Sequence, residues 1–145
     1  MRDAPDPIEL AARALRHRDR SRQQVEARLE RAGVEEERRR DALDTLERVG
    51  YVDDERFAAA RAASLAERGY GDEAVRHLLE ADGVVPEMID KAVAALVPEP
   101  DRAALIVRER GASARVGAQL ARKGFTVESV ESALGAGFAD DAPEA

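Results

Sequence analysis

The sequence contains no cysteine and no tryptophan, and aromatic residues make up only 3% of its 145 residues. The lack of cysteine excludes disulfides and thiolate metal ligands, and it fits a reducing compartment. No apolar run approaches the roughly 20 residues of a membrane span, and residues 1–7 lack the apolar segment of a signal peptide. We therefore expect a soluble, cytoplasmic protein with an aliphatic core and no membrane contact.

Charged residues, by contrast, make up 37% of the chain, and alanine, arginine, glutamate and leucine are used heavily. This composition favours helices. The net charge of −7 is unevenly spread, with 12 basic and 12 acidic residues in 1–49 but 5 basic and 10 acidic residues in 50–97. Bulk charge therefore argues against a general nucleic-acid binder and leaves room only for local, weak DNA contact.

One pattern occurs three times along the chain. Apolar residues lie eight and four positions before a glycine, and another follows it directly. The copies are Val25, Leu29, Gly33 and Val34, then Val75, Leu79, Gly83 and Val84, then Val116, Leu120, Gly124 and Phe125. Each glycine is expected to be the left-handed residue that ends a helix, with the next apolar residue packing back onto that helix. A repeat of this size is typical of arrays that offer a long surface to a partner.

The predicted fold is all-α, with nine helices arranged as three tandem three-helix repeats in an elongated, curved stack. We expect the repeats at residues 7–50, 51–97 and 98–138, and disorder in residues 1–6 and in the acidic tail 139–145. Pro98 and Pro100 are expected to interrupt the chain, so that the next helix begins near Asp101 with Leu105 and Ile106 facing inward. Val49 is likewise expected on an inner face.

Helix starts are marked by polar residues. Ser21 and Gln24 form a capping-box pattern. Asp53 and Asp54 are adjacent carboxylates that could hold a metal, but their place at a helix start is better explained by capping. Thr126 is expected to cap the last helix.

Several short motifs resemble the bacterial RecX family of regulatory proteins. The resemblance covers about Ile8 to Leu134, and the most specific part is the run from Gly50 to Ala58. The matching residues are Arg20 and Ser21, then Gly50, Tyr51, Asp53, Asp54, Phe57 and Ala58, then Gly69, Tyr70 and Gly71, and finally Lys123, Gly124 and Phe125. Gly33 and Gly83 are also expected to have structural roles.

The resemblance implies a non-enzymatic function in homologous recombination, DNA repair and the SOS response. RecX-like proteins bind RecA on single-stranded DNA, lie in the groove of the filament, and restrain its ATPase, strand exchange and co-protease activities. The resemblance also implies the same fold of three three-helix repeats. The chain is more acidic than is typical of DNA-contacting members, and Arg39 stands where the other repeats have Ile89 and Val130.

Clustered arginines are the best candidates for contact with a partner, because the guanidinium fork binds carboxylates and phosphates. The alternative is a solvated helix face on which these arginines pair with Glu26 and Glu30. A smaller basic group in the third repeat could extend the surface. The candidates are Arg13, Arg16, Arg20, Arg22, Arg28 and Arg31, together with Arg115, Arg122 and Lys123.

The aromatic residues could stack on bases, but Phe57 and Phe125 lie on apolar stripes and are better explained as core residues. Tyr51 and Tyr70 follow glycines and are expected to be half exposed. The two histidines, His17 and His77, are isolated, and no nucleotide-binding loop or nucleophile–base pair is visible. We assign no catalytic residue, metal or cofactor.

Three functions remain open on the sequence alone. The first is a RecA modulator that acts as a monomer, with basic contacts in the first and third repeats. The second is a helical-repeat adaptor for another protein. The third is a helix-turn-helix DNA binder, against which the acidic net charge argues.

Overall fold

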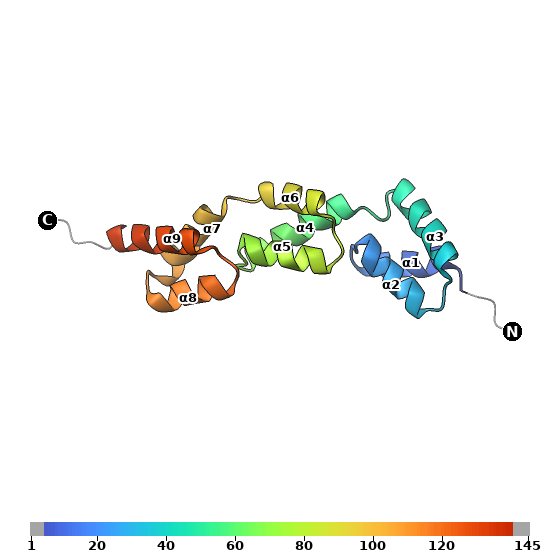
Figure 1. Ribbon diagram of the computed structural model, residues 1–145, viewed down its shortest axis with the longest axis horizontal. Coiled ribbons are helices and arrows are strands. Elements are labelled where there is room, and N and C mark those ends of the chain that lie inside the picture. The colour runs from blue at the N-terminus through green and yellow to red at the C-terminus, as the bar shows by residue number, and fades with distance from the viewer. Residues whose placement is uncertain (1–4, 141–145) are drawn as a thin grey trace.

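The computed structural model describes residues 5–140, and every regular element in this range is an α-helix. Within these residues no helix is both long enough and apolar enough to cross a membrane. The structure confirms the predicted all-α class (Figure 1). The helices are α1 (Pro7–His17), α2 (Arg22–Arg31), α3 (Glu36–Arg48), α4 (Asp54–Glu67), α5 (Asp72–Ala81), α6 (Pro86–Ala94), α7 (Glu99–Arg110), α8 (Ala114–Arg122) and α9 (Val127–Asp140).

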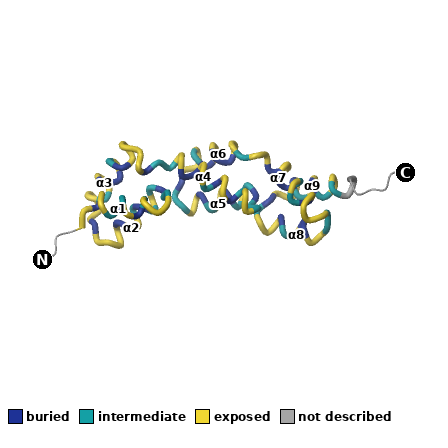
Figure 2. Tube along the Cα trace, turned by 180° about the vertical axis from the view of Figure 1, so that it is seen from behind, coloured by how far each residue is buried: buried dark blue, intermediate teal, exposed yellow. Residues whose placement is uncertain are grey.

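The helices form three groups of three along one long axis, and helices pack mainly within their own group (Figure 1). Each group encloses its own small aliphatic core, and Figure 2 shows buried residues within each of the three groups. The cores are centred on Val25, Leu29 and Leu43, on Val75, Leu79 and Phe57, and on Val107, Leu120 and Phe125. Stability must therefore come from three short cores and the two junctions between them.

The repeated glycines end α2, α5 and α8 as predicted. Gly33, Gly83 and Gly124 have φ of +84°, +85° and +91°, values that residues with a Cβ rarely adopt. The N–H of the residue after each glycine donates to a carbonyl one turn back, as Val34 does to Leu29 at 3.1 Å. The apolar residues that follow are 2%, 4% and 4% exposed, which confirms that they pack back onto the core.

The second helices of the three groups stack end to end, a feature that the sequence did not reveal. Ser21 Oγ, at the start of α2, donates to the carbonyl of Asp82 at the end of α5, at 2.5 Å. The N–H of Gly71, at the start of α5, donates to the carbonyl of Lys123 at the end of α8, at 2.8 Å. The three helix dipoles therefore run head to tail, with each negative end against the next positive end.

A carboxylate at the first position of the following group reinforces each junction. Asp54 Oδ1 accepts from the N–H of Arg22 at 2.7 Å, and Glu99 Oε2 accepts from the N–H of Asp72 at 2.7 Å. These N–H groups belong to the first turns of α2 and α5, where a helix has no internal acceptor for them. At the same position α1 has Pro7 in place of a carboxylate.

Some inward-facing predictions were wrong. Leu105 and Val49 are 53% and 58% exposed, and Ala103 and Val107 are the buried apolar residues of α7. Helix α7 also begins earlier than expected, at Glu99, because Pro100 lies in its first turn instead of interrupting the chain. Proline fits there, since the N–H it lacks has no intrahelical partner in the first turn.

The expected division at residues 50/51 and 97/98 remains a proposal, although Val52 already belongs to the first core. Residues 1–4 and 141–145, where we expected disorder, lie outside the described range. Helix α9 continues to Asp140, two residues beyond the boundary expected at 138, and it packs against α7.

Candidate partner-binding surface

Four arginines from the α1–α2 loop and from α2, namely Arg18, Arg20, Arg28 and Arg31, lie close enough to one another for their charges to interact. Arg20 is partly buried, and its Nε donates to the carbonyl of Ala14 at 3.2 Å. Burial, together with the charges of Arg18, Arg28 and Arg31, lowers the pKa of Arg20 below its usual value. Among the described residues none of these four arginines forms an ion pair with a carboxylate. These four guanidinium groups therefore have no direct carboxylate contact within the described residues.

A second positive site lies where the second and third groups meet. The ammonium of Lys123 lies 4.1 Å from the centre of the Tyr70 ring, and the guanidinium of Arg68 lies 5.7 Å from it. Both cations also follow the C-terminal turns of their helices, where the helix dipole favours positive charge. Tyr70 is half-buried at the junction and holds the two cations close to each other.

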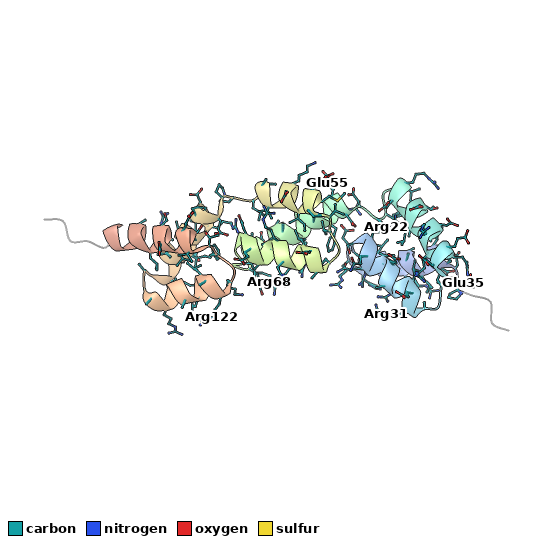
Figure 3. The ribbon with its side chains drawn as sticks, in the orientation of Figure 1. Arg22, Arg31, Glu35, Glu55, Arg68 and Arg122 are labelled. Carbon is teal, nitrogen blue, oxygen red and sulfur yellow. The ribbon has the colours of Figure 1, made fainter. Side chains whose placement is uncertain are left out.

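These two sites lie along one edge of the molecule. Figure 3 shows Arg31, Arg68 and Arg122 following the lower edge, one in each group of helices. We call this surface the basic strip. It consists of Arg18, Arg20, Arg28, Arg31, Arg68, Arg122 and Lys123. It reaches all three groups, whereas the sequence had suggested basic contacts only in the first and third.

Other candidate arginines have different surroundings. Arg22 pairs with Asp44 at 2.9 Å and with Glu47 at 2.8 Å; burial opposes its charge, but the two carboxylates outweigh burial and raise its pKa. Arg13 pairs with Glu9 at 3.1 Å on an exposed face. The partner-binding role of both remains a prediction.

Two further candidates, Arg16 and Arg115, are exposed. Arg16 lines a shallow pocket beside Tyr51, which is 65% exposed. Tyr51 is therefore more exposed than the half-exposed position expected from the sequence. Arg115 lies in the first turn of α8, and its contribution to the surface also remains a prediction.

The motif residues have structural positions. Asp53 caps α4 by accepting from the N–H of Arg56 at 3.0 Å, and Ser21 and Gln24 form the complete predicted capping box. Asp54 instead bonds across the junction to α2. Phe57, Ala58 and Phe125 are buried in the cores, as are Val34 and Val84, which directly follow Gly33 and Gly83.

Sequence reasoning missed the residues that join the second and third groups. Glu99 is 5% exposed and accepts from the N–H of Asp72 and from both the N–H and the hydroxyl of Thr126. Arg102, 8% exposed, donates to the Val97 and Tyr70 carbonyls and to Asp72. A signal was available, because an acidic residue opens both the second and the third group.

The described residues contain no group of three or more histidine or acidic side chains placed to hold a metal ion. The candidate surface is thus a row of cations along an elongated helical stack. Such a surface suits binding to an extended acidic or phosphate-bearing partner. The fold defines the class as helical-repeat proteins.

Comparison with known proteins identifies the family. A profile described as "RecX, second three-helix domain" matches residues 53–93. A regulatory protein RecX from Xanthomonas axonopodis pv. citri is 31% identical over 88% of this chain and 85% of its own length. One from Halorhodospira halophila is 30% identical over 90% of this chain and 88% of its own. The chain belongs to the RecX family of regulatory proteins.

Solved structures show the same fold. The crystal structure of RecX from Lactobacillus salivarius superposes with a TM-score of 0.77 at 15% identity, covering 90% of this chain and 93% of its own. A second crystal structure, of a regulatory protein RecX, gives a TM-score of 0.70 at 21% identity. The match covers 87% of this chain and 70% of the other.

Proposed function

We propose that this protein modulates the RecA recombinase, mainly as a negative regulator, by binding to the RecA filament on single-stranded DNA. Membership in the RecX family carries this proposal, and the sequence motifs had already implied it. The protein restrains ATP hydrolysis, strand exchange and co-protease activity, and it acts in the cytoplasm as a monomer without a cofactor.

The shape of the chain supports binding along a filament. Three helix groups lie in a row, and the basic strip reaches each of them (Figures 1 and 3). An elongated ligand in a helical groove can contact neighbouring subunits at once, and linked contacts strengthen each other without new chemistry. The basic strip then binds acidic side chains of RecA, with weak phosphate contact where the DNA is accessible.

The experiment is a titration of this protein into RecA hydrolysing ATP on single-stranded DNA, with RecA from the same organism. We expect a dose-dependent fall in ATPase at or below equimolar protein, together with shortened or altered filaments in electron micrographs. No change at excess, with circular dichroism confirming a folded helical sample, would contradict the proposal and favour an adaptor for another protein.

A further inference from the structure

A groove lies between the first and second helix groups, away from the basic strip residues. It has a volume of about 510 Å³ and is bounded by the start of α2, the end of α3, the start of α4 and the α5–α6 loop. Its lining joins carboxylates with apolar side chains. The residues that matter are Glu26, Glu47, Asp53, Asp54, Val85 and Met88.

The charge of the groove is negative. Its lining contains four carboxylates and one cation, Arg22, which is already paired with Asp44 and Glu47. Glu26 makes no side-chain hydrogen bond or ion pair among the described residues. Burial, and then the charges of Glu47 and Asp53, raise the pKa of Asp54, although the N–H and the charge of Arg22 oppose this. A cation entering the groove would relieve this repulsion.

One apolar residue of the groove, Val85, belongs to none of the cores, whereas Val52 lies in the first core and Met88 packs against the second. Val85 is the N-cap residue of α6, makes no cap hydrogen bond and is 49% exposed. The equivalent residues before α3 and α9 are Glu35 and Thr126, both polar. Valine at an N-cap sacrifices about 1 kcal/mol relative to serine or threonine. Met88 lies half-buried beside it, and flexible methionine adapts to varied partners.

We propose that this groove binds a basic segment of the partner protein, in which a lysine or arginine is flanked by an apolar side chain. The aliphatic stem packs on Val85 and Met88, and the cationic head reaches the carboxylates of Glu26 and Asp53. Nucleic acid does not fit, because its phosphates would face these carboxylates. The proposal deepens the proposed function and rests on it where the partner is the RecA filament.

Binding of a basic segment is tested directly with ¹⁵N-labelled protein and two synthetic peptides, one of repeated Lys-Leu-Lys and one of repeated Glu-Leu-Glu. The Lys-Leu-Lys peptide should shift the amide signals of Gly83, Val85 and Met88 first, and the acidic peptide should leave them in place. Equal shifts at other exposed carboxylates, such as Glu35 before α3 and Glu37 on α3, would overturn the proposal. This arm does not depend on RecA.

A second arm uses RecA filaments on single-stranded DNA and two variants with the same charge change. Glu26 lines the groove, and Glu30 lies one turn further along α2 outside it. Glu26→Lys should weaken filament binding about 10-fold, and Glu30→Lys should not weaken it. Equal affinities of the two variants would contradict binding of the partner in this groove. Failure of the unaltered protein to bind filaments would instead overturn the proposed function.

Discussion

The N–H of Asp72 donates a 2.7 Å hydrogen bond to Glu99 Oε2, and this bond joins two helix groups at residues 27 apart in the sequence. The other oxygen of the same carboxylate accepts from the N–H of Thr126 at 2.9 Å. One buried side chain therefore caps the starts of both α5 and α9. The third group is fixed against the second through this residue.

Replacing Glu99 should destabilise the stack. Glu99→Gln loses charge-assisted bonds to buried N–H groups, at a cost of about 1.5–3 kcal/mol at pH 7. Urea unfolding followed by circular dichroism measures this cost. Asp101→Asn, an exposed change in the same turn of α7, is the control and should have little effect. Equal free energies of unfolding for the two variants would contradict the role of Glu99.

The stability should also depend on pH through Glu99. Burial opposes its ionisation, but the hydrogen bonds from Thr126, Asp72 and Ser129 outweigh burial and lower its pKa below the ordinary 4.5. A lowered pKa in the folded state means that the stabilisation is present above pH 4.5 and is lost as pH falls through the lower value. The difference in free energy of unfolding between the native protein and Glu99→Gln should therefore become smaller below pH 4.5. A constant difference down to pH 2 would contradict this.

Asp54 occupies the equivalent position at the first junction, but its pKa is shifted the other way. Burial raises the pKa of Asp54, and the charges of Glu47 and Asp53 add to this effect. The folded state therefore favours the neutral carboxyl, and the stabilisation that comes from protonation is lost as pH rises. Asp54→Asn keeps an acceptor for the Arg22 N–H and should not lower the stability at pH 7. Asp54→Ala should cost about 0.5–1.5 kcal/mol. Thermal melts at pH 7 of the two variants distinguish this from a simple need for negative charge, which would destabilise both.

Gly71 is required by close packing, not by its φ of −80°. A Cβ there would lie 2.4 Å from the backbone of Gly124. Gly71→Ala should force the second and third groups apart and cost about 1–3 kcal/mol, with separate unfolding of the third group in the melt. Gly135→Ala, in α9 with nothing within 4 Å of the added carbon, should gain about 0.5–1 kcal/mol. Calorimetry of both variants checks the contrast.

Filament binding should weaken with salt, because exposed charges are screened within about 8–10 Å at physiological ionic strength. Measured between about 50 and 300 mM NaCl, the affinity of the native protein should fall steeply. A variant with Arg68→Gln and Arg122→Gln should show a shallower dependence. The same salt dependence for the native protein and the variant would contradict a role of Arg68 and Arg122 in filament binding.

Much of the fold could be predicted because it depends on residues that lie close together in the sequence. The spacing of Val75 and Leu79 before Gly83 determines one helix, its end and its buried face at once, and the pattern recurs twice. Ser21 and Gln24 cap α2 through atoms three residues apart. Such features need only the geometry of a single helix.

The errors and omissions arise where distant segments meet. Leu105 was expected to face inward, but the packing of α9 along α7 buries Ala103 and Val107 instead. Glu99 and Arg102 bond to residues 27 to 32 positions away, which helical spacing does not reveal. Arg22 resembled the neighbouring arginines in the sequence, yet in the structure its side chain pairs with Asp44 and Glu47 of α3.

The most direct measurement compares two triple variants as inhibitors of the RecA ATPase on single-stranded DNA. One reverses three charges of the basic strip, Arg20, Arg28 and Arg31 to Glu. The other makes the same change on α3, at Arg38, Arg40 and Arg48. With helicity equal by circular dichroism, the basic strip variant should need about 10-fold more protein for half inhibition, and the α3 variant should match the native protein. Unchanged inhibition by the basic strip variant, or equal loss in both, would contradict binding through this surface.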